Sequence, residues 1–143
     1  MTQVAFHFNA PDKLAYACRF ARKMLRSENR LVITAEQPVL DQLDVLLWHM
    51  APHEFVAHGH AGSTAHVLQL SPIILMADPR KAAHHEVLLN VGTAVPLGFE
   101  GFEHLIEVVS ASDENDRQEA RGRWRSYAQQ GYPIVRHDLV LKG

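Results

Sequence analysis

Residues 113–134 read DENDRQEARGRWRSYAQQGYPI, and this stretch predicts one amphipathic helix with a marked beginning and end. Ser110 and Ser112 are candidate N-caps, because a serine hydroxyl can accept a hydrogen bond from the free N–H groups of a first turn. Acidic residues follow at once, where the helix dipole favours negative charge. Gly131 and Pro133 then end the helix, since proline cannot continue its hydrogen bonds and glycine tolerates the turn that follows.

Three arginines share one stripe of this helix when successive residues are placed about 100° apart. The stripe consists of Arg117, Arg121 and Arg125, and Trp124 lies at its border. A large aromatic ring next to guanidinium groups suits a ligand that carries both carboxylates and an apolar group. Two ordinary interpretations stay open at this point, in which the basic stripe is solvated surface and the tryptophan belongs to the core.

The chain before this helix alternates between expected strands and expected helices. The strands are expected at residues 4–9, 31–35, 67–70, 73–76, 86–91 and 105–109, and the helices at residues 12–27, 39–50 and 99–104. The run LVITA at residues 31–35 is continuously apolar, which is typical of a strand covered on both faces of a parallel sheet. The alternation predicts one α/β domain, a three-layer α/β/α sandwich with a mostly parallel sheet of about five strands.

Composition excludes several classes of protein. A net charge of −2 over 143 residues argues against a general nucleic-acid binder, which is normally strongly basic. The single cysteine, Cys18, cannot form an internal disulfide, so a cytoplasmic location is expected. The N-terminus has no signal or transit features, and no apolar run approaches the ~18 residues of a membrane span.

The charge is nevertheless unevenly distributed. Residues 98–116 contain six acidic residues and no lysine or arginine, whereas residues 117–143 contain six basic residues and two acidic ones. A basic segment of this kind can attract an anionic partner locally even when the whole chain is nearly neutral.

No motif for catalysis or nucleotide binding is present. The patterns GxGxxG, GxxxxGK[ST] and GxSxG are missing, and the first strand–helix junction has no glycine that would let a phosphate approach the backbone. Three histidine pairs have spacings that could hold zinc: His49 and His53, His58 and His60, and His84 and His85. Since no thiolate or suitably spaced carboxylate accompanies them, scattered loop histidines are the preferred interpretation, and neither a metal nor a cofactor is expected.

Two blocks of sequence, in their order and spacing, are similar to a known family. The first runs through residues 46–62 as LLW, PHEFVAH and AG, and the second is ARGRWRSY at residues 120–127, closed by GY at residues 131–132. On these blocks the chain resembles the chi subunit of bacterial DNA polymerase III holoenzyme, and the likeness covers nearly its whole length. The resemblance implies a non-catalytic accessory protein with a Rossmann-like α/β/α fold and no bound nucleotide.

The resemblance also implies two partners. Proteins similar to this one bind the acidic, phenylalanine-terminated C-terminal tail of single-stranded DNA-binding protein, so they reach DNA only indirectly. Carried over by position, the residues implied for tail binding are Arg117, Arg121, Trp124 and Arg125. Arg121 matches the family's arginine, whereas Trp124 stands where a tyrosine is common, which keeps a flat wall and removes a phenolic hydroxyl.

The second implied partner is the psi subunit of the clamp loader. Its candidate site is Pro52, Phe55 and Val56, because apolar residues inside an expected loop, residues 51–64, suit a hydrophobic interface. An alternative in which Phe55 folds back onto the protein's own sheet stays open. Trp48, just before this loop, is expected in the core.

Two other functions stay open at this point. The first is an α/β enzyme that binds a nucleotide or a metal, and only the expected architecture supports it. The second is a direct binder of single-stranded DNA, in which the same arginines contact phosphates and Trp124 stacks on a base.

Overall fold

Parallel strands dominate the part of the chain that the structure, a computed structural model, describes: residues 1–49, 59–60 and 72–142. Seven strands form one sheet in the order β3-β4-β2-β5-β6-β1-β7, and every neighbouring pair is parallel. The strands are β1 (Gln3–Ala10), β2 (Leu31–Thr34), β3 (Gly59–His60), β4 (Ile73–Leu75), β5 (Val87–Asn90), β6 (His104–Ser110) and β7 (Ile134–Asp138).

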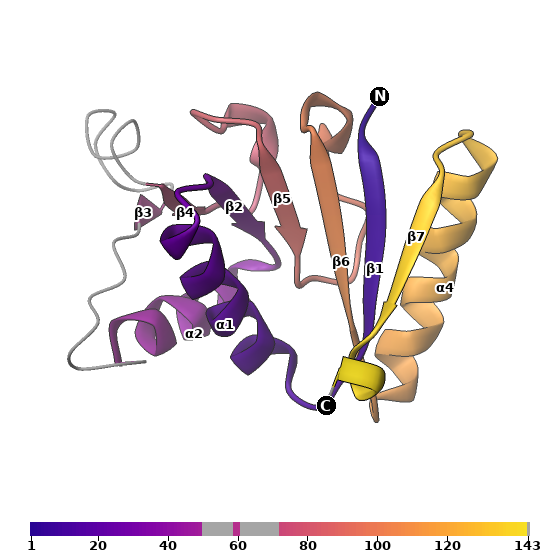
Figure 1. Ribbon diagram of the computed structural model, residues 1–143, viewed down its shortest axis with the longest axis horizontal. Coiled ribbons are helices and arrows are strands. Elements are labelled where there is room, and N and C mark those ends of the chain that lie inside the picture. Colours follow the sequence, from indigo (N-terminus) through magenta and orange to yellow (C-terminus); the bar gives the residue numbers. More distant parts are fainter. Residues whose placement is uncertain (50–58, 61–71, 143) are drawn as a thin grey trace.

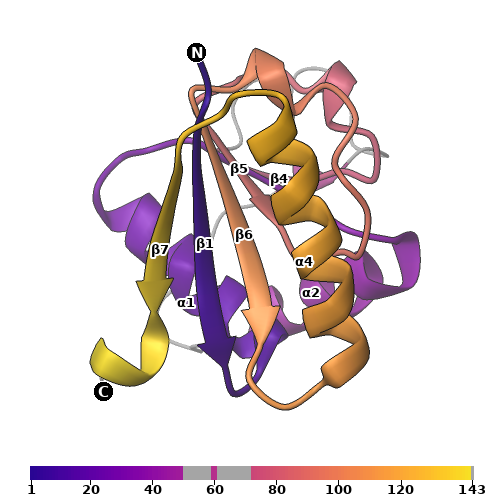
Figure 2. The same ribbon diagram turned by 90° about the vertical axis from the view of Figure 1, so that its right-hand side faces the viewer.

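Helices cover both faces of this sheet. Figure 1 and Figure 2 show α1 (Lys13–Arg26) and α2 (Gln37–His49) on one face and α4 (Glu114–Gln129) on the other. Three 3₁₀ turns complete the elements: η1 (Pro79–Lys81), η2 (Phe99–Gly101) and η3 (Leu139–Lys142). The predicted three-layer α/β/α architecture is therefore confirmed.

The sheet separates two hydrophobic cores. All four residues of β2 are buried, as the continuous apolar run at residues 31–35 predicted. Leu43 and Leu47 of α2 fill the core on one face, and Phe6 and Tyr127 fill the core on the other face, under α4. Val4 and Phe6 of β1 belong to the core under α4, whereas Ala10, which follows a register shift in β1, belongs to the other core.

The sheet is wider than expected. β7 is not expected from the sequence, because residues 134–138 follow the Gly131–Pro133 helix stop and their sequence, IVRHD, does not alternate apolar and polar residues. β3 lies within the expected loop at residues 51–64, and a strand of two residues leaves no periodic signal. The expected helix at residues 99–104 is only the short turn η2. The expected strand at residues 67–70 lies outside the described residues.

The beginning of α4 also differs from the prediction. The N-cap is Asp113, whose carboxylate accepts the N–H of Asp116 at 3.2 Å. Ser110 acts one turn earlier, where its hydroxyl accepts the N–H of Asp113 at 3.0 Å, and Ser112 caps nothing. At the other end, Gly131 adopts φ +88°, which confirms that glycine allows the chain to leave the helix there.

Candidate functional site

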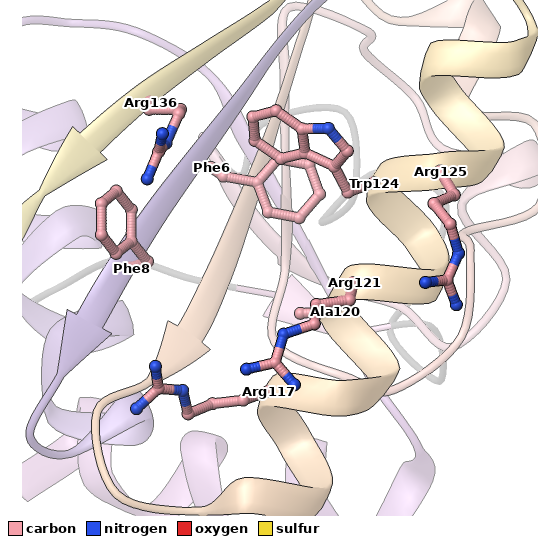
Figure 3. A pocket seen from close by; sticks show the side chains of 8 residues that line it. All are labelled: Phe6, Phe8, Arg117, Ala120, Arg121, Trp124, Arg125 and Arg136. Atoms are coloured by element: carbon pink, nitrogen blue, oxygen red, sulfur yellow. The ribbon is translucent and has the colours of Figure 1, made fainter.

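A surface groove of about 490 Å³ lies between α4 and the strands β1 and β7. Figure 3 shows the residues that line it: Phe6 and Phe8 of β1, Arg136 of β7, and Arg117, Ala120, Arg121, Trp124 and Arg125 of α4. All four residues predicted for tail binding therefore line one groove.

The floor of the groove is aromatic. The ring centroids of Phe6 and Trp124 are 4.9 Å apart, in a tilted arrangement that aromatic pairs favour. Phe6 is buried, whereas Trp124 is only half-buried and lines the groove. Trp124 thus belongs partly to the core and partly to the groove surface, so neither of the two simple interpretations describes it completely.

Arg136 of β7 places a cation over the aromatic rings, on the side of the groove opposite α4. The guanidinium carbon of Arg136 is 5.2 Å from the ring centroid of Phe8 and 6.0 Å from that of Trp124. Both distances are in the range in which a cation is attracted to a ring face. Arg136 therefore places a positive charge at the strand side of the groove, opposite the arginines of α4.

The four arginines differ in how strongly the protein itself engages them. Arg117 donates to the carbonyl of Ala111 at 3.2 Å, and Arg121 pairs with Glu114 at 3.2 Å. The Arg121–Glu114 pair is largely exposed, so it contributes less than ~1 kcal/mol and can exchange for a ligand carboxylate. Within the described part of the chain, Arg125 and Arg136 form no ion pair.

A buried polar network fixes the rotation of α4 about its axis. Glu107 of β6 is fully buried and accepts hydrogen bonds from Arg123 Nε at 3.0 Å and from the Tyr127 hydroxyl. Asn90 Nδ2 donates to the same carboxylate at 3.0 Å. Burial raises the pKa of Glu107, while the charge of Arg123 opposes that rise. With Arg123 and Tyr127 held inward, Arg117 and Arg121 are left on the groove side, and Arg125 extends from the outer side of α4 at the edge of the groove (Figure 3).

A second ion pair fixes the beginning of α4. Lys13 Nζ lies 2.7 Å from Asp116 Oδ1, and Asp116 Oδ2 accepts the backbone N–H of Ser110 at 2.8 Å. Both side chains are largely buried. Two of the six acidic residues at 98–116, Glu107 and Asp116, are therefore paired with cations inside the protein. This pairing reduces the repulsion between the acidic segment and an anionic ligand.

The sequence predicts four of the five lining residues on α4 and none of those on the strands. The missed lining residues are Phe6, Phe8, Ala120 and Arg136. The alternation of Phe6 and Phe8 predicts that they share a face, but not that this face borders α4. Arg136 has no signal without β7, the strand that carries it.

The structure does not test the residues predicted to bind the second implied partner, because Pro52, Phe55 and Val56 lie outside the described residues. The expectation that Trp48 is in the core is wrong, because 51% of its surface is exposed. Its place near the end of α2 explains the error, since the inward stripe of that helix is Leu40, Leu43 and Leu47.

Metal and thiol chemistry find no support in the part of the chain that the structure describes. No group of three or more metal-ligating side chains occurs among those residues. Cys18 is buried, and burial raises the pKa of its thiol to about 11, so it is almost entirely protonated at neutral pH. No described helix has both the length and the apolar character to cross a bilayer.

Comparison with known proteins points to a single family. The family model for the DNA polymerase III chi subunit, HolC, matches residues 1–135. The DNA polymerase III subunit chi of Pseudomonas aeruginosa is 28% identical over 144 residues, covering 97% of this chain and 98% of that protein. The subunit chi of Haemophilus influenzae is 28% identical over 120 residues, covering 82% and 81%.

Proposed function

Because the chain belongs to the DNA polymerase III chi subunit family, a family of non-catalytic accessory subunits, we propose that its α4 groove binds the C-terminal tail of single-stranded DNA-binding protein. We also propose that a separate apolar surface binds the psi subunit of the clamp loader. The protein then links the clamp loader to single-stranded DNA-binding protein in the cytoplasm. Family membership sets aside the alternative of an α/β enzyme.

The observation that carries the first proposal is an aromatic floor enclosed by arginines on two sides. An acidic tail that ends in phenylalanine presents a ring, a terminal carboxylate and further carboxylates in one short segment. Phe6 and Trp124 offer the ring an apolar contact, while Arg121 and Arg136 supply cations on opposite sides of it. Arginine suits carboxylates because its fork of N–H donors can bind both oxygens at once.

The energies are sufficient for a weak, reversible complex. Burial of one phenylalanine ring contributes about 1.5–3 kcal/mol, and a partly desolvated arginine–carboxylate pair about 1.5–3 kcal/mol. Exposed pairs contribute less than ~1 kcal/mol each. After the cost of association this suggests micromolar affinity, and salt should weaken it because most of the charges are exposed.

An exposed apolar face on α2 supports the second proposal. Val45 is 55% exposed, Leu46 41% and Trp48 51%, and all three directly precede the Pro52, Phe55 and Val56 segment in the sequence. At about 100° per residue, Val45 and Trp48 lie about 60° apart around α2, whereas Leu46 lies on the side that borders α1. Large exposed apolar side chains on one surface, such as Val45 and Trp48, are typical of partner interfaces. α2 lies across the sheet from α4, as Figure 2 shows, so the two proposed binding sites are on different sides of the protein.

Calorimetry with an acidic peptide that ends in phenylalanine tests the first proposal. The Arg121→Ala variant should bind at least about 10-fold more weakly, which is the loss of ~1.4 kcal/mol expected for one charge-assisted contact. Its melting temperature should be unchanged, because Arg121 is exposed. Arg19→Ala, an exposed arginine of α1, is the matched control and should bind like the wild type. Equal affinity of the wild type and Arg121→Ala would reject this groove.

Replacement of Trp48 tests the second proposal. Trp48→Ala should weaken the complex with purified psi, measured by calorimetry or size-exclusion chromatography, and leave peptide binding unchanged. A Trp48→Ala variant that binds psi as the wild type does would remove the α2 face from the interface.

A further inference from the structure

A second strongly basic surface lies on α1, across the sheet from the α4 groove (Figure 1). A surface groove of about 470 Å³ there is lined by Arg19, Arg22, Lys23, Arg26 and Ser27. The spacing of its four cations is i, i+3, i+4 and i+7, which places them on one face of the helix. Residues 13–27 contain five basic residues and no acidic one, although the whole chain carries a net charge of −2.

Helix stability accounts for only part of this charge. Lys23 and Arg26 lie in the last turn of α1, where cations complement the helix dipole. Arg19 and Arg22 lie earlier in the helix, where the dipole does not account for them. Arg22, like Arg26, makes a further contact within the protein, whereas Arg19 is exposed. Arg19 also has its guanidinium carbon 5.8 Å from the ring centroid of Tyr16, which keeps it near the helix surface.

We infer that this face of α1 binds the phosphodiester backbone of single-stranded DNA, without sequence preference. Its lining contains four cations and one serine, and the apolar side chains Ala15, Cys18 and Leu46 belong to the adjoining groove that Arg19 and Arg22 also border. It therefore differs from the α4 groove, where three aromatic rings can receive a side chain. Repeated negative charges without an apolar anchor are what a phosphate backbone offers, and three of the four cations are arginines, which bind phosphates bidentately.

The dimensions favour one strand. From Arg19 to Arg26 the helix rises about 10.5 Å, so the face is long enough to contact only a few successive phosphates of one strand. The basic face is one helix wide, so it contacts a single backbone. Because it lies on the other side of the sheet, DNA can bind there while a tail peptide occupies α4. This surface is separate from the arginines of α4 and does not depend on the function proposed for them.

The affinity should be low and strongly dependent on salt. Each phosphate contact with a single strand changes the slope of log K against log salt concentration by about −0.7, so three or four contacts predict a slope of about −2 to −3. Fluorescence anisotropy with a labelled oligothymidylate, at salt concentrations from about 25 to 200 mM, measures this slope directly.

The variant Arg19→Gln/Lys23→Gln removes two exposed cations and leaves in place Arg22 and Arg26, which make further contacts within the protein. We expect a slope smaller by about 1.4 and, at the lowest salt, binding weaker by about 10-fold. Circular dichroism should show an unchanged fold. Arg121→Ala is the matched control and should keep the wild-type slope while it loses the tail peptide, so the two proposals can fail separately.

Three results would overturn the inference. One is a wild-type protein without salt-dependent binding to the oligonucleotide, and another is a double variant that retains the wild-type slope. The third is effective competition by polyaspartate or by duplex DNA at an equal concentration of negative charge. Competition by polyaspartate would indicate that the face binds an acidic protein segment. Competition by duplex DNA would indicate that it binds double-stranded DNA.

Discussion

Removal of the Arg123 guanidinium should destabilise the protein in a way that depends on pH. Arg123 is 3% exposed, and its Nε donates to the fully buried carboxylate of Glu107 at 3.0 Å. In Arg123→Met, that carboxylate keeps the hydrogen bonds from Asn90 and Tyr127 but loses its counter-charge. Breaking a buried pair on one side costs about 3–5 kcal/mol. We expect a loss of this size in the free energy of unfolding at pH 8.

The sign of the pH dependence follows from protonation of Glu107. Burial raises the pKa of this group in the folded protein, and removal of Arg123 raises it further. The folded variant therefore binds a proton at a pH at which the unfolded chain has already lost it. Its deficit in stability should be small near the ordinary pKa of glutamate and should grow as pH rises through the folded pKa.

Urea unfolding followed by circular dichroism at pH 5 and pH 8 measures both effects. The double variant Glu107→Gln/Arg123→Met is the control, because replacing both charges removes the uncompensated carboxylate. It should be more stable at pH 8 than Arg123→Met alone and nearly independent of pH. A loss of less than about 1 kcal/mol in the free energy of unfolding of Arg123→Met at pH 8 would contradict this account of the network. A double variant no more stable than Arg123→Met at pH 8 would contradict it as well.

Three other predictions concern single residues. Arg136→Ala should weaken tail-peptide binding about 10-fold in calorimetry, because it removes the cation above Phe8; wild-type affinity would confine the site to α4. Cys18 should react with a thiol reagent at neutral pH only as fast as the protein unfolds, since burial raises its pKa to about 11; rapid labelling of the folded protein would contradict this. Gly131→Ala should lower the free energy of unfolding by about 1 kcal/mol, because Gly131 has φ +88°. Gly122→Ala should raise it by ~0.5–1 kcal/mol, because Gly122 lies within α4 with open space around it. If thermal unfolding gave the opposite order of stability, these conformations would be contradicted.

The sequence was sufficient for elements whose signal is local. The apolar run at residues 31–35 predicted a buried parallel strand, and the spacing of Arg117, Arg121 and Arg125 predicted the stripe on α4. Both signals, a continuous apolar run and a helical spacing, lie within one element, so the sequence displays them directly. The end of α4 at Gly131 was likewise predicted from local conformational preference.

Features that depend on pairing between distant elements were not predictable. Arg136 joins the groove only because β7 pairs with β1, where Phe6 lies beside Arg136 in register. The sequence does not predict the Glu107–Arg123 pair, because charged residues are normally exposed. The two residues meet only because α4 packs on β6. Trp48 was assigned to the core by hydrophobicity, although the face of α2 that carries it turns away from the sheet.

The emission of Trp124 provides the most direct test of the groove as a receptor for an acidic, phenylalanine-terminated tail. In a Trp48→Phe background, Trp124 is the sole tryptophan, and it lines the groove beside Phe6 and Arg121. We predict that the peptide changes this emission saturably, with the midpoint found by calorimetry, and that a peptide with its last phenylalanine replaced by aspartate does not. Calorimetric binding of the intact peptide without any change in Trp124 emission would place the tail elsewhere on the protein.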